Sequence, residues 1–318
     1  MDAAVLHALG KPPHFEPFAD PVPGDGEVLV HVRAAALKPV DKQVASGSHY
    51  ASPREFPVVC GMDGVGCLDD GTRVFFGGPR RPHGAMAQRT VVRRAQCFPV
   101  PEALDDAVAA ALPNPGMSAW LALNSRAKLA RGESVLILGA TGVTGKLAVQ
   151  ISKLLGAGRV IAVGRNRQVL GTLRDFGADA IICLDQPDQD LTRDFAREAG
   201  ETGFQVIIDY LWGRPTEALL AALTRTEFAA AGPETRLVQA GESAGPTISL
   251  PAAVLRSKAL TILGTAGIPS RETLVDAFQQ VMAHAASGDL RIDTERVPLA
   301  DIENAWQREA RTRLVIIP

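Results

Sequence analysis

Apolar runs that alternate with amphipathic segments dominate the chain from residue 134 onwards. A run at 135–138 precedes a segment of helical spacing at about 144–155, and a run at 160–163 precedes another at about 168–176. Further apolar runs continue this series at 180–184, 206–209, 237–239 and 260–263. Continuous apolar strands separated by helices are required by a parallel sheet that is covered on both faces. The pattern therefore predicts an α/β fold with a doubly wound parallel sheet.

The first third of the chain has a different pattern, in which short β-type runs are separated by glycine and proline. Strands are expected at 27–33, 73–76 and 87–92. Short strands with frequent breakers favour a partly closed β-unit over parallel layers. The sequence thus predicts a second, β-rich domain in front of the parallel sheet.

The stretch Leu112-Pro113-Asn114-Pro115-Gly116 separates the two patterns and is a natural domain boundary. Beyond the alternating series, residues 271–287 have the spacing of a long amphipathic helix, and residues 314–317 that of a final strand. Because both lie past the series, we expect this last strand to return to the first domain. The expected division of the chain is 1–115, 116–265 and 266–318, with the third segment rejoining the first.

Composition and charge exclude several classes of protein. With 318 residues, of which 46% are hydrophobic and 21% charged, the chain is typical of soluble globular proteins. Its formal net charge of -2 supplies no basic surface for nucleic acid or an anionic membrane. No apolar run approaches the roughly 18 residues of a membrane-spanning helix, and residues 1–15 do not resemble a secretory signal. We therefore expect a cytoplasmic protein with no membrane or nucleic-acid partner.

The strongest chemical signal is a glycine-rich loop between the first apolar run and the helix that follows it. The loop reads Gly139-Ala140-Thr141-Gly142-Val143-Thr144-Gly145. Glycines in such a loop let the backbone turn tightly and approach a pyrophosphate, whose charge then faces the free N–H groups of the helix start. A triphosphate-binding loop is excluded, because its spacing of glycines is absent and Leu147 replaces the Ser or Thr that holds magnesium. The alternative is a glycine turn that only packs a helix on a sheet.

The residues after the second apolar run indicate which dinucleotide the loop favours. NAD sites usually place Asp or Glu about 20 residues past the loop, to bind the ribose 2′-OH. Here the stretch reads Gly164-Arg165-Asn166-Arg167, with no carboxylate. Because a guanidinium fork pairs well with phosphate oxygens, the sequence favours NADP(H), with Arg165 and either Asn166 or Arg167 at the 2′-phosphate. A solvated arginine at a strand end is the alternative.

With this loop behind a β-rich front third, the sequence resembles the medium-chain dehydrogenase/reductase superfamily and, within it, the zinc-free quinone oxidoreductase branch. The likeness covers nearly the whole chain and depends on the order of its motifs. They are Gly26-Glu27-Val28-Leu29-Val30, Pro39-Val40-Asp41, Gly61-Met62-Asp63-Gly64-Val65-Gly66, Gly84-Ala85-Met86-Ala87-Gln88, Ser118-Ala119-Trp120, Gly177-Ala178-Asp179 and Lys258-x-Leu260-Thr261-Ile262-x-Gly264. The resemblance implies a Rossmann domain set into a GroES-like substrate domain, with the active site between them. It also implies a homodimer, with 259–264 as the expected edge strand.

The same resemblance bears on zinc. Zinc-dependent relatives carry a catalytic Cys where this chain has Lys38, and a His where it has Met62. An ammonium group cannot ligate zinc unless it is deprotonated, and a thioether is a weak ligand for it. The four cysteines form no Cys-x-x-Cys pair either. The sequence therefore predicts a site without metal. Lys38 is then either a donor to a cofactor hydroxyl or a developing oxyanion, or a lysine paired with Asp41.

Other candidate site residues are weaker. Tyr50, next to His49, is a candidate proton donor at the mouth of the site, or simply a loop residue. Ser118 matches a family position whose hydroxyl lies near the nicotinamide, and an N-cap-like hydroxyl is the alternative. Gln43 stands where relatives place an aromatic residue. Two strand ends at the expected rim supply the last cofactor-binding candidates, Ala240, Gly241, Leu263 and Gly264.

These features lead to one expected activity and two alternatives. Without a Lewis acid an alkoxide is poorly stabilised, whereas hydride transfer to a conjugated acceptor spreads the charge into an enolate or quinol anion. We therefore expect an NADPH-dependent, zinc-independent oxidoreductase acting on a quinone or another conjugated carbonyl compound. An enoyl or alkenal reductase of the same fold, and a non-catalytic NADPH-binding regulatory protein, remain as alternatives.

Overall fold

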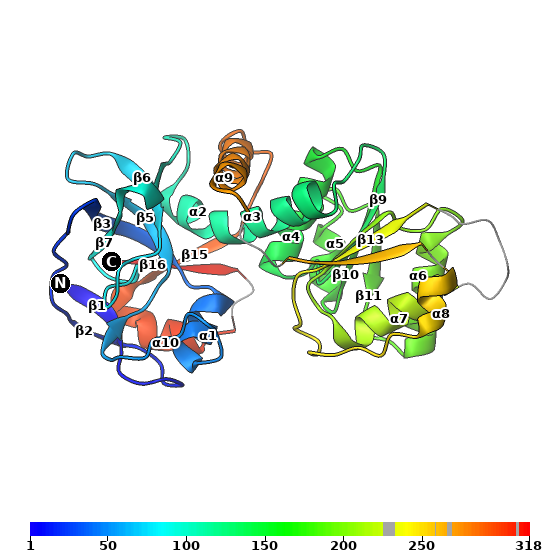
Figure 1. Cartoon of the computed structure of the whole chain (residues 1–318), viewed down its shortest axis with the longest axis horizontal. Helices are drawn as coiled ribbons and strands as arrows, with labels where there is room; N and C mark the ends of the chain where they lie inside the picture. Colours follow the sequence, from blue (N-terminus) through cyan, green and yellow to red (C-terminus); the bar gives the residue numbers. More distant parts are fainter. Residues whose placement is uncertain (225–232, 258, 266–268, 310–311) are drawn as a thin grey trace. The chain divides into compact units, whose positions relative to one another are not determined.

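The computed structural model of the chain describes residues 1–224, 233–257, 259–265, 269–309 and 312–318 (Figure 1). These residues form two compact units. Unit 1 contains Met1–Asn114 and Met282–Pro318, and unit 2 contains Pro115–Val281. The domain division expected at 115/116 and 265/266 remains a prediction, and Lys258 and residues 266–268 lie outside the described residues.

Unit 2 is built on a six-stranded sheet in which neighbouring strands are parallel. Its strands are β9 (Ser134–Leu138), β10 (Arg159–Gly164), β11 (Ala180–Cys183), β12 (Val206–Asp209), β13 (Thr235–Gln239) and β14 (Leu260–Gly264). Their order is β11-β10-β9-β12-β13-β14, so the direction of winding reverses between β9 and β12. Ligands of open α/β sheets bind at such a reversal, beyond the carboxyl ends of the strands. The predicted doubly wound sheet is confirmed.

Both faces of this sheet are buried, because Val135, Leu136 and Ile137 point alternately to the two faces and each has 0% exposure. The helices α6 (Asp188–Ala199) and α7 (Gly213–Leu223) pack on the face that holds Leu136. The remaining helices that lie wholly within unit 2 are α4 (Val143–Leu154), α5 (Arg167–Thr172) and α8 (Ala252–Ser257), and Leu121–Arg126 is π-helical. The helix expected at about 168–176 is shorter, because the amides of residues 173–177 each donate three residues back and form tight turns.

The described part of unit 1 forms two sheets, as expected for a β-rich region. The smaller sheet has the order β2-β1-β4 and consists of β1 (Asp2–Leu6), β2 (His14–Pro17) and β4 (Val58–Val59). The larger sheet has seven strands in the order β15-β16-β3-β5-β6-β8, with β7 paired to β3. They are β3 (Glu27–Ala36), β5 (Asp63–Cys67), β6 (Arg73–Gly77), β7 (Arg89–Arg93), β8 (Cys97–Pro99), β15 (Thr294–Pro298) and β16 (Arg313–Ile317).

The final strand lies in the interior of this sheet, between β15 and β3. β16 pairs antiparallel with β3, with Val315 opposite Ala36, and parallel with β15. Short helices accompany the sheets, namely α1 (Pro39–Ser46), α2 (Asp106–Ala111) and α10 (Ile302–Gln307). Two helices run across the ends of the units in sequence, α3 (Pro113–Trp120) and α9 (Arg271–Ala286). Among the helices of the described ranges, none has both the length and the apolar character needed to cross a bilayer.

Candidate functional site

The glycine loop connects β9 to α4 and is packed tightly against β10. Gly139 has a φ of 89°, a left-handed conformation that favours glycine. The amides of Gly139 and Ala140 both donate to the carbonyl of Val163, at 2.9 and 2.8 Å. A Cβ atom at Gly145 would lie 2.2 Å from the carbonyl oxygen of Gly139, so no larger residue fits there. The glycines therefore bring the first turn of α4 directly onto the backbone of the loop.

This arrangement leaves the start of α4 suited to bind an anion. The helix begins after Gly142, which supplies no side-chain cap, and its first turn contains no acidic residue. Lys146 is the first residue whose amide donates to Gly142 across a full turn, at 2.9 Å. The amides before it have no acceptor within the helix, and the helix dipole adds a partial positive charge. The pyrophosphate site expected from the spacing of Gly139, Gly142 and Gly145 is compatible with this geometry and remains a prediction.

The end of β10 carries two arginines beside this loop. A Cβ atom at Gly164 would lie 2.5 Å from Cγ2 of Thr141, so β10 ends in close contact with the loop. Arg165 and Arg167 are exposed, and within the described ranges neither guanidinium has an ion-pair partner. Asn166 differs, because its Oδ1 accepts a hydrogen bond from the amide of Val169 at 3.1 Å and caps α5. The two arginines are therefore the free cationic groups at this strand end.

The remaining strand ends of the same edge are joined by Asp209, which the sequence analysis did not identify. Its backbone carbonyl accepts from the amides of Ala240 and Gly241, at 2.7 and 3.1 Å. A Cβ atom at Gly241 would lie 2.7 Å from the carbonyl of Tyr210. The ends of β12 and β13 are thus held together by the backbone, and Leu263 and Gly264 end the next strand, β14.

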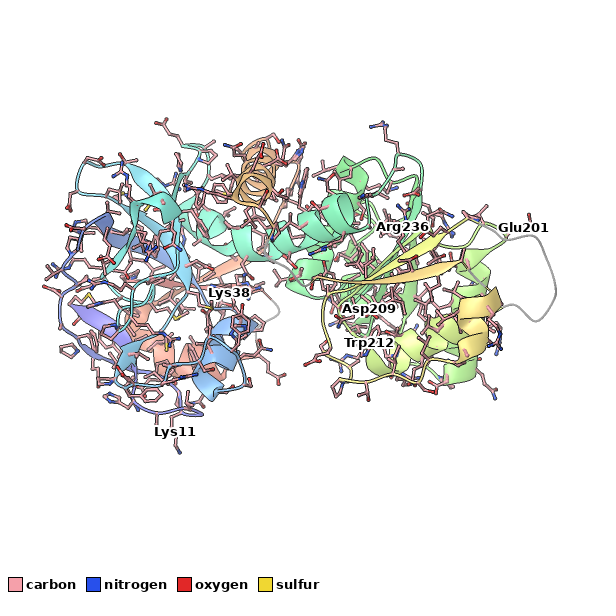
Figure 2. The ribbon with its side chains drawn as sticks, viewed as in Figure 1. Lys11, Lys38, Glu201, Asp209, Trp212 and Arg236 are labelled. Carbon is pink, nitrogen blue, oxygen red and sulfur yellow. The ribbon has the colours of Figure 1, made fainter. Side chains whose placement is uncertain are left out.

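The Asp209 side chain, labelled in Figure 2, is buried, and both of its carboxylate oxygens accept hydrogen bonds. Its Oδ1 accepts from the amides of Leu211 and Trp212 at 2.8 and 2.9 Å, and its Oδ2 accepts from the Thr216 hydroxyl at 2.5 Å. Burial raises the pKa of Asp209, and these three donors oppose that rise. The residue shapes a turn in which Trp212 has a φ of 56°. A carboxylate ending a buried apolar strand is the only sequence signal for it.

Ser118 lies inside α3 and not at its start. The helix begins at Pro113, and the Ser118 side chain is exposed. The N-cap-like alternative for this hydroxyl is therefore wrong, because the proline-containing stretch is already helical from its first proline. A role near the nicotinamide remains a prediction.

In unit 1, Lys38 is buried and paired (Figure 2). Its ammonium Nζ lies 2.7 Å from Oδ1 of Asp63, 3.2 Å from Oδ2 of Asp41 and 3.1 Å from the carbonyl of Ala36. Burial opposes the charge, but the two carboxylates outweigh it and raise the pKa of Lys38. With 1% exposure, the side chain is almost entirely enclosed by the protein. The geometry favours the paired-lysine alternative.

A second cation completes what we call the ion cluster, Lys38, Asp41, Asp63 and Arg313. Arg313 of β16 donates from Nη1 to the carbonyl of Leu37 at 3.0 Å, and its charge interacts with both carboxylates. Asp41 also accepts from the amide of Met62 at 3.2 Å. The cluster thus links α1, the segment before β5 and the last strand. Two positive and two negative side chains balance one another in the interior of unit 1.

The positions that correspond to zinc ligands in related enzymes do not fit zinc. Lys38 presents an ammonium group already bonded to two carboxylates, and the side chain of Met62 is a thioether. Across the described residues, no group of three or more His, Cys, Asp or Glu side chains is placed to hold a metal ion. Zinc independence itself remains a prediction.

Tyr50 lies on the surface of unit 1. It is 97% exposed, and its ring lies 4.1 Å from the ring of His49. The structure therefore brings Tyr50 together with His49, and it shows no contact of Tyr50 with Lys38. Gln43 is also exposed, on α1. The proposed proton-donor role of Tyr50 has no support from its surroundings.

Comparison with known proteins agrees with this geometry. Residues 143–286 match the family described as zinc-binding dehydrogenase, a range that excludes Lys38 and Met62. The whole chain is 26% identical to the whole of the probable NADPH-dependent quinone reductase tdiC of Emericella nidulans. It is 30% identical over 203 residues to the quinone oxidoreductase of Sus scrofa, covering 61% of this chain and 60% of that one.

The fold has the same relatives. The solved structure of the quinone oxidoreductase from Thermus thermophilus covers 100% of both chains with a TM-score of 0.81 and 27% identity. The sheet order, the glycine loop and these similarities point to the same group of proteins. The chain is therefore similar in sequence and fold to quinone oxidoreductases, and its resemblance to that branch of the medium-chain dehydrogenase/reductase superfamily is confirmed.

Proposed function

We propose that this chain is an NADPH-dependent, zinc-independent oxidoreductase that reduces a quinone or another conjugated carbonyl compound. The observation that carries the proposal is the uncapped start of α4 behind the loop Gly139–Gly145, together with two guanidinium groups at the next strand end, Arg165 and Arg167, that have no ion-pair partner among the described residues. The names of the relatives in Emericella nidulans and Sus scrofa support the same chemistry.

The residues of unit 2 account for each charged part of the cofactor. The amides at the start of α4 hold the pyrophosphate, and Arg165 with Arg167 holds the ribose 2′-phosphate. The backbone groups of Ala240, Gly241, Leu263 and Gly264 line the same edge, at the ends of β13 and β14. When bound, NADPH supplies the hydride.

A conjugated carbonyl acceptor suits the described side chains at the positions that correspond to zinc ligands in related enzymes, Lys38 and Met62. The ammonium group of Lys38 is neutralised by Asp41 and Asp63. A quinone or enone needs less help, since its developing negative charge spreads over several atoms and is accommodated by hydrogen-bond donors or water. The residues of the protein then act mainly by binding and orienting both reactants.

We also infer that the protein works as a cytoplasmic homodimer. β14 ends the six-stranded sheet and pairs on one side only, with β13, among the described strands. An edge strand of this kind is a template for pairing with a second copy of the chain. Sedimentation should give a single species of twice the chain mass, and a purely monomeric species would contradict the inference.

The test of the cofactor is a comparison of NADPH and NADH. The rate at which 1,4-benzoquinone oxidises each coenzyme is measured from the loss of nicotinamide absorbance. We expect NADPH to be oxidised faster than NADH. Replacing both arginines, Arg165→Ala with Arg167→Ala, should weaken NADPH binding by about 100-fold or more, because two charged hydrogen bonds worth about 1.5–3 kcal/mol each are lost. NADH binding should not change.

The matched control is Arg193→Ala, an exposed arginine of α6 that pairs within its own helix with Asp190. It should leave both affinities unchanged. Equal use of NADPH and NADH by the wild type would contradict the assignment of the arginines. Absence of NADPH oxidation with every conjugated acceptor, despite tight binding, would contradict the enzymatic activity itself.

A further inference from the structure

Unit 1 contains a pocket of its own, with a volume of about 140 Å³. Its apolar walls come from Leu6 at the end of β1, Val44 and Ala45 of α1, Val58 of β4, and Met62 just before β5. Leu6, Ala45 and Val58 are buried, with 1%, 3% and 7% exposure. These walls belong to four separate parts of the chain, and the pocket is therefore part of the folded core of the unit.

One side of this pocket is formed by the ion cluster. Asp41 lines the pocket, but its carboxylate already accepts from the amides of Lys38 and Met62, at 2.9 and 3.2 Å, and pairs with the Lys38 ammonium. Lys38 itself does not line the pocket. The interior of the pocket is thus apolar, and the charge of its one carboxylate, Asp41, is neutralised by Lys38, which lies outside the pocket.

The entrance is different, because it has a fixed positive charge. Arg81 and Gly78 line the pocket and are exposed, so the pocket opens to the surface beside the guanidinium. Arg81 donates from Nη2 to the carbonyl of Ala51, and its planar fork carries five N–H donors in all. His83 lines the pocket as well, but burial lowers its pKa, so the imidazole is neutral at pH 7.

The volume sets the size of the occupant. An engineered apolar cavity of about 150 Å³ in another protein binds benzene, which is a single six-membered ring. A pocket of 140 Å³ with similar walls accommodates one ring of this kind. A second fused ring would need extra space. Closely packed side chains such as Leu6 and Val58 would have to move to provide it, which costs free energy.

We propose that this pocket selects the acceptor of the enzyme. It binds a conjugated carbonyl compound with a single ring, with the ring between Leu6, Val44 and Val58 and the carbonyl oxygen on the guanidinium of Arg81. The preference for one ring follows from volume, and the preference for a carbonyl over a hydrocarbon follows from the charged donor at the entrance. As a statement about the hydride acceptor, this inference rests on the proposed function.

The first test measures binding alone, without cofactor or turnover. Acetophenone and 2-acetonaphthone differ by one fused ring, and neither attacks cysteine thiols. Titration followed by protein NMR should show acetophenone binding at least about tenfold more tightly, a difference of about 1.4 kcal/mol. Signals of residues that line the pocket should move. Equal affinities, or shifts elsewhere in the protein, would overturn the proposal.

A pair of variants locates the binding. Val44→Trp fills the pocket from α1 and should abolish acetophenone binding. Val22→Trp makes the same substitution at a site of unit 1 with 74% exposure, and should change nothing. NADPH affinity, which depends on unit 2, and the thermal unfolding midpoint show whether Val44→Trp is folded. Acetophenone binding that survives in a folded Val44→Trp protein would overturn the proposal.

A second variant does not depend on filling the pocket. Arg81→Met removes the N–H donors and keeps a long side chain. This variant should weaken the binding of acetophenone about tenfold or more. It should not change the binding of toluene, which has the ring without the carbonyl. An equal loss for both ligands would show that Arg81 only supports the loop, and would overturn its role in recognition.

Turnover separates this inference from the proposed function. In the presence of NADPH, Val44→Trp should lower kcat/KM for 1,4-benzoquinone by about tenfold or more, whereas Val22→Trp should not. If no acceptor oxidises NADPH, the proposed function fails while the binding results stand. If benzoquinone is reduced at the wild-type rate by folded Val44→Trp, the activity stands and the pocket is not the acceptor site.

Discussion

Two charged regions of this chain differ in whether their charges have partners. In unit 1, the ion cluster places two cations near two carboxylates in the interior, with ion pairs from Lys38 and a charge interaction from Arg313. In unit 2, the start of α4 and the arginines after β10 present positive charge that no described side chain neutralises. The first arrangement satisfies itself and supports the structure. The second leaves positive charge for the anionic groups of the proposed cofactor.

This difference distinguishes two roles of a positively charged side chain near a site, a structural role and a ligand-binding role. Lys38 stands at a position that relatives use for chemistry, yet its bonds to Asp41 and Asp63 favour a structural role. Arg165 is an ordinary exposed residue by burial, yet its lack of a partner among the described residues makes it a ligand-binding candidate. Variants of the two regions should therefore change different quantities, namely stability in one case and cofactor affinity in the other.

The largest effect is expected from Lys38→Met. It leaves Asp41 and Asp63 buried with one cation fewer, and breaking a buried pair in this way costs about 3–5 kcal/mol. Urea unfolding measures the loss. Lys153→Met provides the matched control, because it breaks the partly exposed pair with Asp179, worth about 1 kcal/mol or less. Affinity for NADPH should be unchanged, and a large loss of that affinity would instead place Lys38 at the cofactor.

The pH dependence of this variant follows from the same charges. In the wild type the pKa of Lys38 is raised above its unfolded value, so its contribution is complete below about pH 10 and is lost as the pH rises through the folded value. In Lys38→Met the unpaired carboxylates gain protons as the pH falls. The difference in stability between the two proteins should therefore shrink from pH 7 towards pH 4. A stability difference between the two proteins that grows as the pH falls would contradict the ion pairing of Lys38 with the two carboxylates.

A smaller effect, on cofactor affinity, is expected from Gly145→Ala. The new Cβ would lie 2.2 Å from the carbonyl oxygen of Gly139, and the loop must move away from the pyrophosphate position. We expect the Kd for NADPH to rise about 100-fold, which corresponds to about 2.8 kcal/mol. Gly171→Ala on α5 is the control, because nothing lies within 4 Å of its added Cβ. Unchanged affinity in Gly145→Ala would remove the loop from the cofactor site.

The smallest effect compares two buried threonines of unit 2. Thr216 donates to the carboxylate of Asp209 at 2.5 Å, and Thr235 donates to the carbonyl of Phe204 at 2.6 Å. Hydrogen bonds to charged groups are worth about 1.5–3 kcal/mol and neutral ones about 1 kcal/mol. Thr216→Val should therefore destabilise more than Thr235→Val in urea unfolding. The reverse order would mean that Asp209 is not ionised in the folded protein.

The parallel sheet was predictable from sequence because its strands are buried on both faces. Such strands appear as continuous apolar runs, for example in Ser134–Leu138 and Val206–Asp209. The short strands of unit 1 carry a weaker pattern, and β1, β2, β4, β5, β8 and β15 were not identified. The π-helical segment Leu121–Arg126 was also missed, because one extra residue in a helical turn leaves no mark on hydrophobic spacing.

The candidate site divides in the same way. The glycine loop and Arg165 lie within one βαβ unit, so local spacing is enough to predict them. The pairing of Lys38 with Asp41 is also local, so it could be expected from the sequence as one of two alternatives. The contributions of Asp63 and Arg313 depend on tertiary contacts, the latter across 276 residues to Leu37. No local pattern brings such residues together.

The position of β16 has a consequence for how the chain is made. Unit 2 is one continuous stretch, so a growing chain contains all of it once residue 281 has left the ribosome. The larger sheet of unit 1 stays divided until β16 is synthesised and inserts between β3 and β15. Until then Lys38 faces two carboxylates without the counterbalance of Arg313. The β-rich unit is therefore completed only after translation of residues 313–317, when the Rossmann sheet already has all of its strands.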